Sequence, residues 1–178
     1  MNRSAIAFAG FLLILGGAAH AQDAPSRETV TAMQAEIAAL RAREDIRELL
    51  HAYGRTLDAR DFDAFAQLWT DDAEYLGGGN TAPVIGGPAI AEFLENIFAA
   101  NPSGFGEPSA HIFFNESIAV TGASATGTSM SGFVTTAEDG PQLSILARYE
   151  DEYALEDGRW KFARRAVRGL GPAPTPAD

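Results

Sequence analysis

Apolar residues in the first half of the chain recur at three- and four-residue steps, the spacing of one face of an α-helix. The longest such pattern predicts a helix over Thr29–Leu57, with no Pro, and no Gly before Gly54. Its apolar positions are Val30, Met33, Ile37, Leu40, Ile46, Leu49, Leu50, Tyr53 and Leu57. A short helix should follow Asp61, which is placed to cap it, and a third should begin at Pro88. Between them we expect a short strand, Ala73–Leu76.

The second half changes to a period of two residues, the spacing of a strand with one buried face. Four strands are predicted: His111–Val120, Ala123–Thr136, Gln142–Leu155 and Arg159–Leu170. Helices first and strands afterwards predict an α+β fold, with the helices on one face of a mostly antiparallel sheet. A strongly curved sheet closed by helices would form a cone with one deep pocket, where a ligand could bind.

Both ends of the chain are predicted to lie outside this domain, which we place at residues 29–170. Residues 1–21 combine one positive charge, a central apolar run and an Ala-His-Ala cleavage site, as in a secretory signal. The apolar run is shorter than the roughly 18–20 residues that span a bilayer. Residues 22–28 are interpreted as a polar linker and the Pro-rich residues 171–178 as a disordered tail. We therefore expect a bacterial protein exported to the periplasm or medium, without a membrane anchor after cleavage.

Composition narrows the range of partners. The 178 residues include 13 Lys and Arg against 24 Asp and Glu, a net charge of −11. This acidic surplus argues against nucleic acid and against anionic membrane surfaces. The chain has no Cys and only three His, one of them within the predicted signal. Disulfides, thiolate metal sites and multi-His metal sites are therefore not expected, and we expect neither a metal nor an organic cofactor.

Acid–base chemistry remains, and His111 and Asp58 are its first candidates. His111 opens a strand on the same predicted face as Phe113 and Asn115, with Ile118 and other apolar residues on the opposite face. There an imidazole can act as a general base or acid, and a buried structural His is the alternative. Asp58 is at the end of the long helix, where the helix dipole disfavours a carboxylate. A neighbouring imidazole would explain why a carboxylate is found there. Alternatively, the helix end is solvated and an Arg lies nearby.

Tyr53 and Tyr75 are the candidate phenols. Tyr53 lies on the apolar face of the long helix, and a buried phenol needs a hydrogen-bond partner that a substrate oxygen can supply. Core packing is the alternative for both residues. Tyr53 and Asp58 are about 140° apart on a regular helix. Both reach one pocket only if the helix distorts, which Gly54 makes easier, or if it ends at Asp58.

Two arginines of the last strand, Arg164 and Arg168, share the predicted parity of Trp160 and Phe162. They are rare positive charges in an acidic chain. Either they bind an acidic substrate group inside the curved sheet, or they offset negative charge at its edge.

Several segments spread over most of the chain carry a family resemblance. They are Glu44–Leu50, Leu57–Asp63, Leu68–Ala73, Gly86–Ile90, His111–Asn115 and Asp157–Phe162. Together they resemble the SnoaL-like domain of the nuclear transport factor 2-like superfamily, over about residues 42–167. The resemblance implies a cone of three helices against a strongly bent, mostly antiparallel sheet, usually as a homodimer or homotrimer.

Within that superfamily, scytalone dehydratase and bile-acid 7α-dehydratase pair an Asp at the end of the first helix with a His at the start of the first long strand. Asp58 and His111 match those positions. Tyr53 matches the catalytic Tyr of the bile-acid enzyme, and Tyr75 matches a Tyr of scytalone dehydratase. The chain lacks the second His of scytalone dehydratase and has Tyr149 where that enzyme has Asn, so the fungal substrate is not expected.

Two functions therefore remain open. The first is an exported, cofactor-independent lyase or isomerase, dehydratase-like, in which an Asp58–His111 dyad moves a proton on a small cyclic apolar substrate. Its expected substrate-binding residues are Phe113, Asn115, Tyr149, Trp69 and Arg164. The second is a non-catalytic domain that binds a hydrophobic ligand or dimerises, in which the same two residues pin the helix to the sheet. An open pocket at the dyad would favour catalysis, and a sealed interior would favour structure.

Overall fold

The structure is a computed structural model that describes residues 25–102, 105 and 108–170. In chain order this part contains α1 (Arg27–Asp58), α2 (Phe62–Ala66), β1 (Trp69–Leu76), β2 (Val84–Ile85), α3 (Gly87–Ala100), β3 (Ser109–Thr121), β4 (Ser124–Ala137), β5 (Gly140–Glu156) and β6 (Arg159–Gly169). The predicted signal, residues 1–21, and the predicted tail, residues 171–178, lie outside the described residues. No helix among the described residues is long and apolar enough to cross a membrane.

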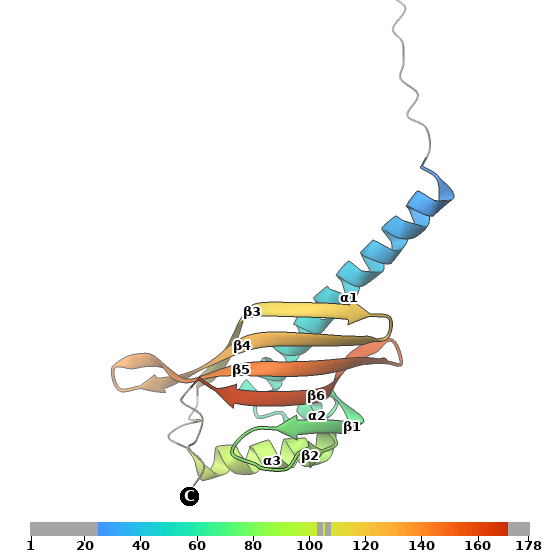
Figure 1. The fold of residues 1–178 in the computed structure, drawn as a ribbon. Helices are drawn as coiled ribbons and strands as arrows, with labels where there is room; N and C mark the ends of the chain where they lie inside the picture. Colours follow the sequence, from blue (N-terminus) through green and yellow to red (C-terminus); the bar gives the residue numbers. More distant parts are fainter. Residues whose placement is uncertain (1–24, 103–104, 106–107, 171–178) are drawn as a thin grey trace, which may run out of the picture.

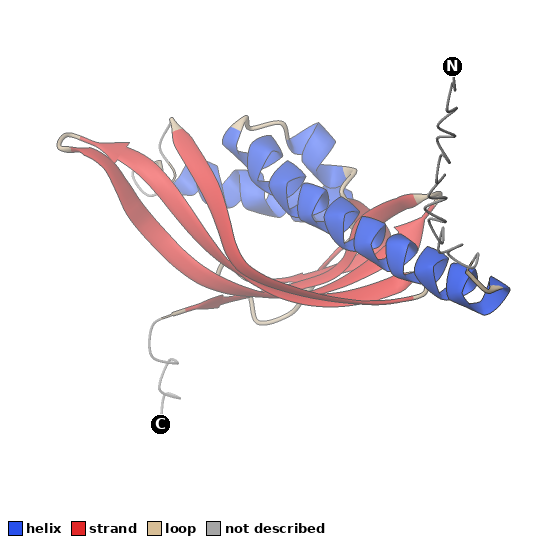
Figure 2. Ribbon diagram, turned by 90° about the horizontal axis from the view of Figure 1, so that it is seen from above, coloured by secondary structure: helices blue, strands red, loops and turns tan. Residues whose placement is uncertain are grey.

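The six strands form one strongly curved sheet, and the helices lie on its concave side (Figures 1 and 2). The strand order is β2-β1-β6-β5-β4-β3, and every neighbouring pair is antiparallel except β1 and β6. The predicted α+β cone is therefore confirmed. Its core fills the space between the concave face and the C-terminal half of α1, whose residues Ile46, Leu50 and Leu57 are almost completely buried.

The helices start and end close to where the sequence places them. Helix α1 begins two residues earlier than predicted because the Ser26 side chain accepts a hydrogen bond from the Thr29 backbone N–H. Asp61 caps α2 as expected, through its bond from the Ala64 N–H at 3.0 Å. Helix α3 begins at Gly87, with Pro88 in its first turn. Strand β1 starts at Trp69 rather than Ala73, and β2 was not predicted because two residues carry no periodicity.

Two bulges change which side chains point inward. In β3 the pairing with β4 shifts between Phe114 and Ser117, and Asn115 adopts a φ of +56°. In β6 the pairing with β5 shifts after Phe162, which leaves Ala163 as the extra residue. A bulge reverses the alternation of faces along a strand. Predictions made by counting every second residue past either bulge are therefore wrong.

Candidate functional site

Asp58 and His111 form a hydrogen-bonded pair where the end of α1 meets the start of β3. The His111 ring Nδ1 lies 2.7 Å from Asp58 Oδ1, and the His111 backbone N–H donates to Oδ2 at 2.8 Å. The His111 side chain is 7% exposed and that of Asp58 is 21% exposed. A carboxylate accepts, so Nδ1 is the nitrogen that donates, and in the neutral imidazole the lone pair is then on Nε2. No hydrogen bond to Nε2 is present among the described residues.

Gly54 allows this pair to form, though not by distorting the helix. Helix α1 runs unbroken through Gly54 and ends at Asp58. A Cβ at Gly54 would lie 3.0 Å from His111 Cβ and 3.0 Å from a ring carbon of Phe113. The missing side chain therefore lets α1 and β3 approach closely, one turn before the carboxylate reaches the imidazole. The sequence left open whether the helix bends at Gly54 or ends at Asp58. The structure shows that it ends at Asp58.

Tyr53 occupies the centre of the interior, beside His111. Its ring makes edge contacts with the rings of His111, Phe113 and Tyr149, at centroid distances of 6.1, 6.3 and 6.0 Å. It also touches Phe65, Trp69 and Phe162. Burial is the main cause that raises the pKa of the Tyr53 phenol well above its usual value. Tyr53 is therefore a neutral hydrogen-bond donor at physiological pH.

Tyr75 lies in the same interior but further from the imidazole. Its ring contacts Trp69 and Phe93, at centroid distances of 6.0 and 6.0 Å. Burial again raises the pKa of its phenol, with a smaller lowering from the neighbouring Arg165 and Tyr53. No ring contact with His111 is present in the described part of the chain, so Tyr75 is placed near Tyr53 rather than beside the dyad.

A buried guanidinium, which sequence reasoning missed, lies on the other side of Tyr53. Arg165 is fully buried and binds Asp151 through two hydrogen bonds of 2.8 Å. Its guanidinium carbon lies 4.2 Å from each of the ring centroids of Tyr53, Tyr149 and Phe162. Burial alone would lower the pKa of Arg165, but the Asp151 charge and hydrogen bonds outweigh it, so the pKa is raised and the group stays charged.

One donor of this guanidinium is unused. Among the described residues, Arg165 Nη1 and Trp69 Nε1 are buried and have no hydrogen-bond partner. Buried donors are normally satisfied, so each of these two could bind an acceptor such as a substrate oxygen. A signal for this cluster existed in the sequence: Asp151 shares the apolar parity of Tyr149 and Tyr153, and a carboxylate on a buried face needs a cationic partner.

The structure brings together some of the predicted substrate-binding residues and not others. Phe113, Tyr149 and Trp69 all contact the Tyr53 ring. Asn115 is exposed at the bulge in β3, where Ile118 rather than Asn115 packs toward the core. The predicted shared face of His111 and Asn115 is therefore wrong, because the bulge reverses the alternation.

Arg164 is also turned away from the interior. Its side chain is 32% exposed and lies 3.7 Å from Glu74 and 3.7 Å from Glu152. Arg168 is more exposed still and lies 3.8 Å from Glu150. The structure therefore agrees that these two arginines offset negative charge, but it places them on β6, between β1 and β5, rather than on an edge strand. The bulge at Ala163 gives the inward position to Arg165 instead.

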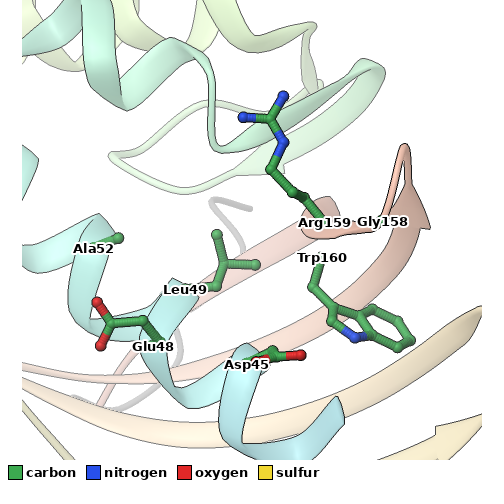
Figure 3. A pocket seen from close by; sticks show the side chains of 7 residues that line it. All are labelled: Asp45, Glu48, Leu49, Ala52, Gly158, Arg159 and Trp160. Atoms are coloured by element: carbon green, nitrogen blue, oxygen red, sulfur yellow. The ribbon is translucent and has the colours of Figure 1, made fainter. Parts of the chain in front are cut away.

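Two cavities lie away from the dyad. One, of about 290 Å³, lies between α1 and the turn joining β5 to β6 (Figure 3); its walls are Asp45, Glu48, Leu49, Ala52, Gly158, Arg159 and Trp160. Another, of about 360 Å³, is lined by residues of β3 to β6, including Thr126 and Tyr153. Neither is lined by Asp58 or His111. Around the dyad, the described residues place the rings of Tyr53, Phe113 and Phe133 beside His111.

The described residues contain no group of three or more His, Asp or Glu arranged to hold a metal ion. What the arrangement offers instead is a set of proton-transfer and hydrogen-bonding groups: the His111 imidazole, the neutral Tyr53 phenol and the charged Arg165. Tyr53 touches both of the others, so a small molecule bound against its ring would be near a base and near a cation.

Solved structures of similar fold include proteins assigned as enzymes. An NTF2-like protein with a cystatin-like fold from Novosphingobium aromaticivorans is 24% identical, with a TM-score of 0.73, over 84% of this chain and 95% of that one. A candidate scytalone dehydratase from the same organism is also 24% identical, with a TM-score of 0.61, over 78% and 91%. LinA is 22% identical, with a TM-score of 0.61, over 80% and 99%. At these identities the likeness shows the fold alone.

The sequence comparisons are more specific about the family. No functionally curated protein matches the chain significantly. The pattern of the SnoaL-like domain, however, matches residues 38–166, which is most of the chain and includes Asp58, His111, Asp151 and Arg165. The protein therefore belongs to the SnoaL-like domain family and has the NTF2-like fold of that family.

Proposed function

We propose that this protein is an exported, cofactor-independent lyase or isomerase that moves a proton on a small cyclic, largely apolar substrate. One observation carries the proposal: Asp58 holds the His111 imidazole through Nδ1, and no described residue forms a hydrogen bond with Nε2, which lies beside the aromatic interior. An oriented imidazole with a free nitrogen is the usual arrangement of a general base.

In the proposed reaction, His111 Nε2 removes a proton from the carbon next to a carbonyl group. Negative charge then develops on the carbonyl oxygen, which the Tyr53 phenol and the free Nη1 donor of Arg165 would stabilise. The protonated imidazole returns its proton to a hydroxyl group on the next carbon, which leaves as water. Returning the proton to another carbon instead would give an isomerisation with the same residues.

The packed interior sets a condition on this mechanism. The His111 ring lies 4.7 Å from the Phe133 ring and 6.4 Å from that of Phe113, measured between centroids. A substrate at Nε2 would therefore lie against these two rings. They would form apolar walls of the bound state, which favours a flat, cyclic substrate over a charged one.

The proposal is tested with a simple β-hydroxy ketone, 3-hydroxycyclohexanone, whose dehydration gives a conjugated enone that absorbs in the ultraviolet. We expect wild-type protein to accelerate the dehydration and His111→Gln to reduce the rate by about a hundredfold or more. His51→Gln is the matched control, because His51 lies on the exposed surface of α1 and its side chain is 53% exposed. Full activity of His111→Gln would contradict the mechanism.

A second function is favoured by a specific observation. Both carboxylate oxygens of Asp58 are bound by His111, one by the backbone N–H and one by the ring. The same two hydrogen bonds would be expected if the pair only stabilised the packing of α1 against β3. The domain would then bind a ligand or a partner without catalysis. In that case His111→Gln lowers the melting temperature, and neither wild-type nor variant protein turns over the ketone.

Export is part of the proposal and has its own test. Residues 1–21 are the proposed signal, and cleavage would follow Ala21. Mass spectrometry of the protein recovered from the periplasm of an expressing bacterium should show a chain that begins at Gln22. Recovery of the uncut chain from the cytoplasm would contradict export and would leave the catalytic proposal untouched.

A further inference from the structure

The N-terminal half of α1 presents an apolar stripe to solvent. Val30, Met33, Ile37 and Leu40, which we name the α1 stripe, are 39%, 55%, 46% and 55% exposed. Figure 1 shows this half of the helix, in blue, projecting beyond the curved sheet. Four large apolar side chains in one row on a projecting helix are unfavourable in water unless something covers them.

The α1 stripe does not continue the face that α1 packs against its own sheet. That face carries Ile46, Leu49, Leu50, Tyr53 and Leu57. At 3.6 residues per turn, the mean directions of the two sets differ by roughly 160° around the helix axis. The stripe therefore points away from the side on which the domain has its core, so the domain's own packing does not account for it.

The spacing and the residue types of the α1 stripe indicate which kind of surface would pack against it. Steps of three, four and three residues give the a, d, a and d positions of two heptads. Both a positions, Val30 and Ile37, are β-branched, whereas both d positions, Met33 and Leu40, are not. This distribution is the one that favours two parallel helices over other coiled-coil arrangements.

The charges beside the stripe fit the same arrangement. In this heptad assignment Glu36 is at a g position and Arg41 is at the following e position, and both are exposed. In a parallel pair, a g residue of one helix faces the next e residue of the other. Glu36 of each copy would therefore meet Arg41 of the other, giving two symmetric pairs of opposite charge.

We propose that the α1 stripe is the contact surface for a second copy of this chain, paired through a short parallel coiled coil. Two heptads are fewer than the three or four that make a free coiled coil recognisable. Here, however, α1 is a single helix of 32 residues anchored in the domain, so pairing does not require a new helix to nucleate. A short interface of this size predicts a dimer that dissociates on dilution.

Sedimentation equilibrium of the purified full chain over a range of concentrations tests the surface. We expect a reversible monomer–dimer equilibrium in the wild type, and a dimer dissociation constant roughly a hundredfold higher in Ile37→Asp. Ala35→Asp is the matched control: it adds the same charge at an exposed position on the opposite side of the same helical segment and should leave the constant unchanged. A wild-type monomer, or equal effects of the two variants, would overturn the proposal.

Cross-linking tests the parallel register separately. The chain has no Cys, so Met33→Cys introduces one thiol per copy. Facing d positions of a parallel pair should let it oxidise to a covalent dimer, whereas Ala35→Cys should stay monomeric under the same conditions. A stripe covered by residues 1–24 of the same chain, or by the exposed apolar side chains of the outer sheet, would leave Met33→Cys uncross-linked and would overturn the proposal.

Discussion

Two carboxylate pairs among the described residues differ in how deeply they are buried and in which cation or ring binds the carboxylate. Asp151 and Arg165 are fully buried, joined by two hydrogen bonds, and enclosed by three aromatic rings. Asp58 and His111 lie at the edge of the same core and are partly exposed. Each pair has one nitrogen with no hydrogen-bond partner among the described residues, Arg165 Nη1 and His111 Nε2. The buried pair holds the sheet and the aromatic rings together, and the partly exposed pair is the one that we propose takes part in chemistry.

Tyr53 connects the two pairs. It contacts the His111 ring on one side and the Arg165 guanidinium on the other. In the proposed mechanism, a substrate bound near Tyr53 would place its oxygen at the Arg165 Nη1 donor and its acidic C–H group at the His111 imidazole. The comparison leads to predictions whose expected effects decrease from the buried pair toward the surface.

The largest effect should come from breaking the buried pair. Asp151→Ala leaves the Arg165 charge without its partner, and we expect the free energy of unfolding to fall by about 3–5 kcal/mol. Urea denaturation measures this. The double variant Asp151→Leu, Arg165→Met is the control, because it removes both charges and should cost much less. Equal losses in the two variants would mean that the charges are not what matters at this position.

The second-largest effect should be a fall in the free energy of unfolding at alkaline pH. Burial is the main cause that raises the pKa values of Tyr53, Tyr75 and Tyr153 in the folded state. Their contribution to stability is therefore complete below the unfolded-state value of about 10 and is lost as the pH rises above it. Absorbance titration should show these phenols ionising only as the protein unfolds. Ionisation of Tyr53, Tyr75 and Tyr153 near pH 10 in folded protein would contradict their burial.

A smaller effect is expected at the close approach of α1 and β3. Gly54→Leu must push β3 away, and we expect a loss of about 1–3 kcal/mol together with lower dehydration activity, because Asp58 and His111 separate. Ala52→Leu, two residues earlier on the same helix, is the control, since Ala52 faces a cavity with room for the larger side chain. If both variants behave alike, the spacing at Gly54 does not position the dyad.

The smallest effect is expected at the neighbour of the buried arginine. Arg164 makes only long, partly exposed ion pairs with Glu74 and Glu152. Arg164→Gln should change the free energy of unfolding by less than about 1 kcal/mol, and added salt should remove the difference. A loss as large as that of Asp151→Ala would show that the two adjacent arginines have been assigned to the wrong faces.

The sequence predicted the fold well because its periodicities are long and change once, from helix to strand. It also pointed to Asp58 and His111, since each is unusual for its local element: an acid at a helix C-terminus and a histidine opening an aromatic strand. Asn115 and Arg164 were placed inward because the alternation of faces was assumed to be unbroken. The bulges at Asn115 and Ala163 depend on pairing with neighbouring strands, which no single-strand pattern records.

The central claim is that Asp58 fixes the His111 imidazole with its free nitrogen available as a base. Nitrogen-15 NMR of the histidine rings at neutral pH tests it most directly, with His51→Gln used to assign the His111 signals. The account predicts a proton on Nδ1 and an unprotonated Nε2 in the wild type, and loss of this preference in Asp58→Ala. A protonated Nε2 in the wild type would contradict the claim.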